Sequence, residues 1–454
     1  MRAPEKQNLA RLILALPLFF PLVATAAENT LNGGISLGQA YDSNIYRASS
    51  NDESEWKSIL TPSMLYTRSE PTNTLSLKYA PGIVYNYRND DKYMDQFASA
   101  KYDLLLSQKL QIHFLDTYIL TDEPYSDSAS NLQANQGNPY YGTAGRPDSI
   151  QINDQRGQNR YWTNNFTTSA DYEYAQESTV NIGYQHYILD NEDETIADFV
   201  KNSPHASIMH RWNQQWDTKL AYRFIKGDFD DIEPLTGTTS TNNNSEDLTT
   251  NATDAYLYYN FTPFSSIFGH YGYSQTDYDG IKEDYDSHTL SAGANHRISP
   301  TLSLGGEAGA SLLQRDSADT NAFYMRLSLN QAWEKSSWVL SADSGLDEQQ
   351  FSGVDNLGLS RYWMIRNTFN HTFTKDITGM AGLSFRDDTY LDRLPQEKEQ
   401  ELQGDALLAY SFSQWYQLSL RYTYVNHIAD LATNEYDDHR ILLQLSAAKD
   451  LLKW

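Results

Sequence analysis

Alternation of apolar and polar side chains along almost the whole chain limits what this protein can fold into more than any other feature. In 216–224 (WDTKLAYRF), every second side chain from Trp216 to Phe224 lies on one face, and Lys219 and Arg223 lie on the other. A period of two residues is typical of a β-strand whose two faces meet different surroundings. The same alternation recurs in 75–88, 302–312, 323–330, 338–347 and 416–424.

The length of these segments indicates a membrane rather than a soluble sheet. They extend over roughly 10 residues or more, whereas strands of soluble proteins average about 5–6 residues. A tilted strand needs about 9–11 residues to cross a bilayer with its apolar face toward lipid. Because an open sheet edge would leave backbone groups without partners in lipid, the sheet must close. We therefore predict an all-β fold, a transmembrane antiparallel up-and-down β-barrel.

The connections between the segments alternate between short and long, as in bacterial outer-membrane barrels with short periplasmic turns and long extracellular loops. The longest loops are expected at 122–158, 228–247 and 388–400. The pattern predicts about 20 strands, with 16 to 20 acceptable, and both termini in the periplasm. Short turns are expected at 71–74, 108–110, 175–178, 213–215, 262–265, 299–301, 334–336, 374–376 and 413–415.

Composition excludes several other classes of protein. The 454 residues contain no cysteine, so disulfide frameworks, thiolate metal sites and cysteine nucleophiles are excluded. A net charge of −25 argues against binding to nucleic acid, which depends on Lys and Arg contacts to phosphates. A mean hydropathy of −0.62 and the lack of an 18-residue apolar run after the first residues exclude helical membrane spans.

Residues 1–26 are expected to form a secretory signal peptide. Arg2 and Lys6 precede the apolar run 12–23 (LILALPLFFPLV), and the small residues Ala24 and Ala26 mark a cleavage site. Residues 27–454 would then form the mature barrel outside the cytoplasm. The first strand starts soon after the cleavage site, so no N-terminal plug domain is expected.

Aromatic residues gather beside the turns, as expected for girdles at the two membrane surfaces. Two polar residues disagree with this arrangement. Asp116 and Asn367 fall on the predicted lipid-facing side, so either a bulge changes the register or both lie outside the hydrocarbon. The aromatic pairs are Tyr85 and Tyr87, Tyr161 and Trp162, Tyr172 and Tyr174, Trp212 and Trp216, Trp333 and Trp338, and Trp415 and Tyr416.

The first 90 residues carry a resemblance to a known family. The segments 32–47 (NGGISLGQAYDSNIYR) and 56–90, with the Thr61-Pro62-Ser63 step and the YAPGIVYNY strand, resemble the second β-barrel porin family. Members of that family are outer-membrane barrels associated with exopolysaccharide and PEP-CTERM gene clusters. The resemblance implies an outer-membrane barrel that serves export or organisation of a surface polysaccharide, and it supplies no catalytic residues.

No cofactor is expected, and we do not expect an enzyme. The best catalytic candidate is Asp286-Ser287-His288, but in a strand Ser287 points away from the other two, so a triad would need a bulge. The acidic loops raise the question of divalent cations, which prefer oxygen ligands. Either these loops are solvated surface or they bind a cation through Asp190, Glu192, Asp193 and Glu194.

The polar faces of the strands predict the inner wall of the barrel. Bases outnumber acids on these faces by about four charges, which would attract an anionic polymer. Alternatively, the charges pair across strands and stabilise the sheet. The predicted acids are Asp103, Asp171, Glu173, Asp217, Glu307, Asp343, Asp347 and Asp405. The predicted bases are Lys78, Arg88, Lys101, Arg211, Lys219, Arg223, Arg297, Arg326, Arg366, Arg386, Arg421 and Arg440.

A barrel of this size would leave a wide channel. We expect the long loop 122–158 to fold inward as a constriction through Tyr140, Tyr141, Arg146 and Arg156. A surface loop is the alternative.

The sequence as a whole favours an integral outer-membrane channel for a surface or extracellular polysaccharide. Two alternatives stay open: a general diffusion porin for small solutes, and a structural or adhesive barrel that does not conduct. Expected partners are outer-membrane lipid, lipopolysaccharide, the barrel-assembly machinery, the polysaccharide and periplasmic export components. The C-terminus departs from the usual assembly signal, because Asp450 interrupts the alternation that ends at Leu452 and Trp454.

Overall fold

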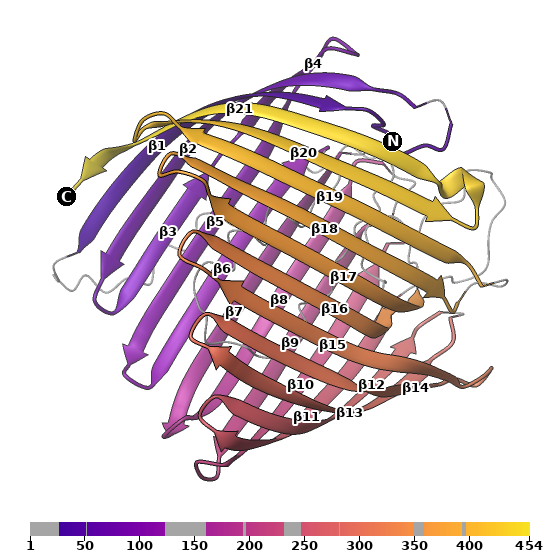
Figure 1. The fold of residues 1–454 in the computed structure, drawn as a ribbon. Coiled ribbons are helices and arrows are strands. Elements are labelled where there is room, and N and C mark those ends of the chain that lie inside the picture. The colour runs from indigo at the N-terminus through magenta and orange to yellow at the C-terminus, as the bar shows by residue number, and fades with distance from the viewer. Residues whose placement is uncertain are drawn as a thin grey trace.

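The computed structural model describes 27–50, 52–122, 160–193, 197–230, 247–280, 282–348, 358–392 and 396–454. In these residues the chain forms one closed antiparallel barrel of 20 strands, as predicted (Figure 1); one of these strands is interrupted, so 21 strand segments are labelled. The strands are β1 (Glu28–Asp42), β2 (Glu55–Glu70), β3 (Asn73–Tyr79), β4 (Gly82–Asn86), β5 (Asp91–Ser107), β6 (Leu110–Thr121), β7 (Tyr161–Ala175), β8 (Ser178–Asn191), β9 (Phe199–Arg211), β10 (Trp216–Phe229), β11 (Leu248–Thr262), β12 (Ser265–Tyr278), β13 (Tyr285–Ser299), β14 (Leu302–Gln314), β15 (Thr320–Ala332), β16 (Ser336–Glu348), β17 (Leu359–Thr372), β18 (Ile377–Tyr390), β19 (Lys398–Ser411), β20 (Tyr416–Ala429) and β21 (Tyr436–Lys453).

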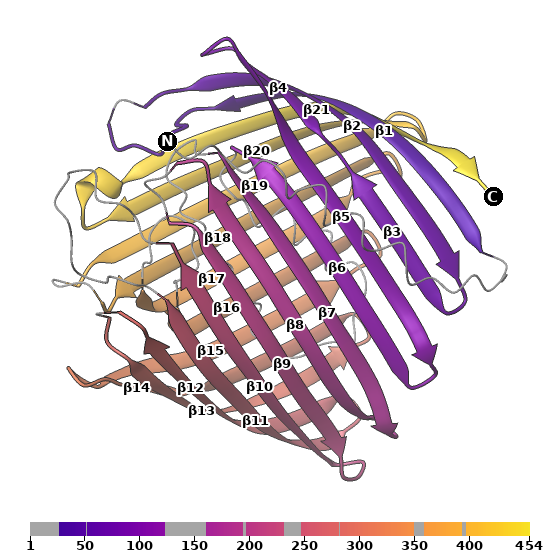
Figure 2. The same ribbon diagram turned by 180° about the vertical axis from the view of Figure 1, so that it is seen from behind.

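Each strand pairs with its neighbours in the sequence, and the first strand closes the sheet on the last. Residues 30–42 of β1 pair antiparallel with residues 440–453 of β21, while the other edge of β1 pairs with β2. Figures 1 and 2 show the strands running obliquely around the barrel from the two sides. Closure gives every strand a hydrogen-bonded neighbour on both edges, which lipid requires.

One predicted strand is interrupted. The segment 75–88 becomes β3 and β4, with Ala80 and Pro81 between them, and both parts pair with β2 and β5. Proline has no N–H to donate to a ladder, which accounts for the break at this position. The two labels therefore make one strand of the barrel.

Each of the predicted short turns connects two consecutive strands, and these turns gather at one end of the barrel (left in Figure 1). Their side chains include exposed aromatics such as Trp212, Phe264, Trp333 and Trp415, as a girdle requires. Tyr161 was wrongly expected in the girdle, because it is 1% exposed and packs in an apolar cluster.

That apolar cluster lies at the opposite ends of the strands, where β7 begins and β8 ends. It includes Tyr161, Leu189, Phe199, Leu248 and Leu313. The described residues also contain a 3₁₀ helix, η2 (Ala432–Asn434). Within the same ranges, no helix is long and apolar enough to cross a membrane.

Asp116 and Asn367 both keep the outward register, so no bulge moves them. Asp116 pairs with Ala100 and Phe166 in unbroken ladders. Asn367 pairs with Leu340 and Leu383 in the same way.

Candidate functional site

The two faces of each strand separate as the alternation predicts. Large apolar side chains such as Leu220, Leu290 and Leu420 are 53%, 69% and 45% exposed on the outside. The predicted bases lie at the alternating, inward positions of their strands, with one exception. Arg88 lies in the turn between β4 and β5, where its guanidinium pairs with Glu53.

Several inward bases have a carboxylate partner in the wall. Arg211 donates two hydrogen bonds to Asp217, at 2.7 and 3.0 Å. Arg421 lies 3.3 Å from Asp405. These contacts match the predicted alternative, in which wall charges pair across and along the strands. Further pairs are Lys101 with Asp103 at 3.1 Å, Arg440 with Asp438 at 2.6 Å and with Asp42 at 3.0 Å, and Arg386 with Asp347 at 2.8 Å and with Asp388 at 2.5 Å.

The inner wall also holds acids that the sequence reading missed. These additional acids outnumber the additional inward bases, which are Lys57 and Lys201. When all described charged residues of the inner wall are counted, the expected excess of positive charge is therefore absent. Their positions in the alternation of polar and apolar residues could have predicted that they face inward. Most of them lie near strand ends, however, where it is hard to tell from sequence which side chains face inward. These acids are Asp42, Glu55, Asp95, Asp254, Asp388, Glu399, Glu401 and Asp438.

A buried ionic cluster centres on His270 of β12. Its Nδ1 lies 2.7 Å from Glu307 Oε1, and its Nε2 lies 2.9 Å from Asp254 Oδ1. Because ionised carboxylates only accept hydrogen bonds, both ring nitrogens donate, which is the pattern of an imidazolium. The Tyr256 ring stacks on the imidazole at 4.1 Å between centroids. Ser291 Oγ donates to Glu307 at 2.5 Å and lies 3.2 Å from His270 Nδ1, so it belongs to the same hydrogen-bonded cluster.

The candidate Asp286-Ser287-His288 is not assembled as a triad. The ladders of β13 are regular at these residues, so Ser287 faces inward while Asp286 and His288 face outward. Asp286 accepts a 2.9 Å hydrogen bond from the Tyr273 hydroxyl. The Tyr271 hydroxyl lies 2.9 Å from His288 Nδ1.

The acidic loop candidates are only partly described. Glu192 pairs with Arg160 at 3.2 Å, and Asp190 lies near the end of β8. In the described parts of the chain, no group of three or more His, Asp or Glu side chains is arranged to hold a metal ion. Some predicted residues lie outside the described ranges: the signal peptide 1–26, Glu194, and the constriction residues Tyr140, Tyr141, Arg146 and Arg156.

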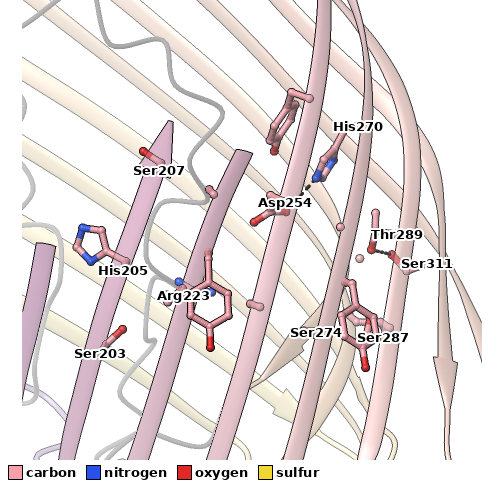
Figure 3. A pocket seen from close by; sticks show the side chains of 18 of the residues that line it. Ser203, His205, Ser207, Arg223, Asp254, His270, Ser274, Ser287, Thr289 and Ser311 are labelled. Carbon is pink, nitrogen blue, oxygen red and sulfur yellow. Dashed lines mark hydrogen bonds and ion pairs between the residues drawn. The ribbon is translucent and has the colours of Figure 1, made fainter. Parts of the chain in front are cut away.

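A hollow of about 410 Å³ opens in the inner wall and is lined by residues of β7 to β17 (Figure 3). Its lining carries many hydroxyl groups; those of Thr289 and Ser311 lie 2.7 Å apart. The lining also contains basic and tyrosine side chains. The inward residues of the lining include Ser203, His205, Ser207, Lys219, Arg223, Asp254, Tyr256, His270, Ser274, Ser287, Thr289, Ser311, Tyr324, Arg326 and Tyr362.

Solved structures that share the fold include a bacterial siderophore receptor and an iron transporter. A mutant of the ferric enterobactin receptor PfeA from Pseudomonas aeruginosa matches 92% of this chain and 81% of its own, with 8% identity and a TM-score of 0.51. The FrpB iron transporter from Neisseria meningitidis matches 92% and 82%, with 9% identity and a TM-score of 0.50. OpdQ from Pseudomonas aeruginosa matches 93% and 98%, with 12% identity and a TM-score of 0.43.

No curated protein matches the chain in sequence. A family model does match, over residues 163–449, which is more than half of the chain. The match lies beyond the first 90 residues on which the sequence resemblance rested. With a closed barrel whose outer surface is apolar, the chain is an integral outer-membrane protein, and it belongs to the family described as "Putative beta-barrel porin 2".

Proposed function

We propose that this protein is a channel through which a saccharide polymer crosses the outer membrane, in the export or organisation of a surface exopolysaccharide. The observation that carries the proposal is the hydroxyl-rich hollow in the inner wall. Serine, threonine and tyrosine hydroxyls both donate and accept hydrogen bonds, so they can replace the water around sugar hydroxyls. Membership of a porin family supports a channel.

The first test uses two neighbouring residues of β11. Ala252 lies in the lining of the hollow, and Thr253 is exposed on the outer surface. Ala252→Trp would fill the hollow and reduce the passage of saccharides, whereas Thr253→Trp would place an aromatic ring in lipid and leave passage unchanged. Swelling of proteoliposomes in sugars of graded length measures passage.

The second test is genetic. Deletion of the gene should abolish secreted polymer, and the intact protein should restore it, while the Ala252→Trp variant should not. A barrel that admits small sugars without affecting secretion would be a general diffusion porin. A barrel that admits none and leaves secretion intact would have a structural or adhesive role, and either result would reject the proposal.

A further inference from the structure

The hollow exists because small residues face inward on three consecutive strands. Ala221 of β10, Ala252 of β11 and Gly272 of β12 all belong to its lining. Ala221 and Gly272 both pair with Asp254, and Ala252 lies two residues before Asp254 on the same face of β11, so the three small residues surround Asp254 and form the floor of the hollow. Longer side chains project beside this floor, which leaves a space against the wall rather than a flat surface.

Cationic side chains stand on both sides of the floor. Lys219 and Arg223 flank Ala221 on the same face of β10, about 13 Å apart along the strand. His205 of β9 is the direct ladder partner of Arg223. Figure 3 shows His205 and Arg223 on neighbouring strands at the edge of the hollow.

Lys219 differs from the paired bases of the wall. It is half-buried, and its ammonium lies 5.9 Å from the centre of the Tyr256 ring. Within the described residues, no carboxylate lies within ion-pair distance of it, in contrast to Arg211, Arg386, Arg421 and Arg440. A half-buried ammonium without a close anion is a favourable place for an anionic group of a ligand.

The described lining contains Lys219, Arg223 and Arg326 against one acid, so its negative charge offsets these cations only in part. Asp254 is the acidic residue among the described lining side chains, and its carboxylate accepts a hydrogen bond from His270. The hollow as a whole is therefore cationic, although the rest of the described wall is not.

We infer that the hollow is a subsite for an anionic sugar unit of the transported polymer, with Lys219 and Arg223 binding its charged group and Ser207, Ser274 and Thr289 binding ring hydroxyls. This inference rests on the proposed function and names its substrate class, an acidic polysaccharide. The distance between the two cations allows them to contact charged groups on different sugar units. A chain of sugars could then pass from one cation to the next.

Calorimetric titration of the detergent-solubilised full-length barrel with tetragalacturonate tests the subsite directly. Lys219→Gln and Arg223→Gln should each raise the Kd about tenfold, the effect of losing a hydrogen bond to a charged group. Lys219→Arg should retain binding. The control is Lys78→Gln on β3: Lys78 also faces inward and contacts the Phe97 ring at 5.2 Å, but it lies outside the hollow. It should change the Kd by less than about twofold.

Two further ligands test whether the hollow recognises an acidic sugar rather than any sugar or any anion. Maltotetraose, which is neutral, should bind at least about tenfold more weakly than tetragalacturonate, and inorganic phosphate should not compete at equal concentration. Equal losses in the Lys219 and Lys78 variants, equal affinity for maltotetraose, or competition by phosphate would each overturn the subsite. Because binding is measured without transport, a barrel that binds tetragalacturonate but fails the swelling test would contradict the proposed function and not the subsite. Each variant is first checked for heat-modifiable migration, which reports a folded barrel.

Discussion

The side-chain amide of Asn164 donates a 2.7 Å hydrogen bond to the carboxylate of Asp116 on the outer surface of β6 and β7. Asp116 lies halfway along β6, on the face shared by Phe114 and Tyr118. A carboxylate facing lipid is costly, and a single amide donor satisfies one of its oxygens. The pair therefore reduces the cost of a polar group in the hydrocarbon without removing it.

Replacing only Asn164 should lower the free energy of unfolding of the barrel, whereas replacing both residues should not. Asn164→Leu leaves the carboxylate without its donor and should lower the free energy of unfolding by about 1–3 kcal/mol. Asp116→Leu combined with Asn164→Leu should raise it above the wild type by about 1–2 kcal/mol, because polar groups on the lipid face destabilise barrels. Guanidinium titration in lipid vesicles measures both. A double variant as unstable as Asn164→Leu would contradict this account.

Arg386 forms a deeply buried ionic contact of the inner wall. Its side chain is 6% exposed, its guanidinium bonds to Asp347 and Asp388, and the Tyr362 ring lies 4.7 Å away. Arg386→Met would remove the guanidinium from two buried carboxylates, so we expect a loss of about 3–5 kcal/mol in the free energy of unfolding. The same guanidinium titration measures the loss.

Two comparisons separate this effect from a general loss of packing. Arg421→Met removes a cation that is 24% exposed, and it should cost less than half as much. The triple change of Arg386→Met, Asp347→Leu and Asp388→Leu should recover most of the loss, because apolar residues often replace a buried ionic group without cost. A loss below about 1 kcal/mol for Arg386→Met alone would show that the ionic contact adds little.

The strands and turns could be predicted from the sequence because their signals are local. Alternation fixes the two faces of a strand from a few residues, so the strand number and the short turns were correct. The contacts of the wall depend instead on register. Asp347 and Arg386 are 39 residues apart and meet only because β16, β17 and β18 pair as they do. For the same reason, the sequence alone could not place Ala221, Ala252 and Gly272 in one floor.

The pH dependence of stability should report on Asp198, which lies in the connection between β8 and β9, outside the strands. Burial raises the pKa of its carboxyl above the ordinary 3.8, and the nearby charges of Asp190 and Asp230 act in the same direction, against a hydrogen bond from the Asn191 N–H. The folded state then holds this proton more tightly than the unfolded state. The contribution of Asp198 to the free energy of unfolding is therefore fully present below about pH 3.8, and it is lost as the pH rises through the pKa of the folded state.

Asp198→Asn removes this dependence and keeps an oxygen for the 2.6 Å hydrogen bond from the Asn191 N–H. The Tm of the variant should exceed that of the wild type at neutral pH, and the difference should vanish near pH 3.5. Asp279→Asn is the control, since Asp279 is an exposed residue of another connection at the same end of the barrel. A difference between Asp198→Asn and the wild type that is constant from pH 3.5 to 7 would reject the assignment.

The packing of β13 against β14 requires a glycine at 309, and a second glycine provides the matched control. A Cβ built on Gly309 would lie 2.1 Å from the carbonyl oxygen of Leu290 and 2.6 Å from the Cα of Ser291, which are backbone atoms that cannot move aside alone. A Cβ on Gly404 of β19 would meet nothing within 4 Å. Gly309→Ala should therefore displace one strand from the other and cost more than about 2 kcal/mol, whereas Gly404→Ala should change stability by less than about 0.5 kcal/mol. Heat-modifiable migration after refolding into vesicles gives the folded fraction of each. Equal folded fractions for the two alanine variants would mean that the backbones of β13 and β14 do not approach this closely at Gly309.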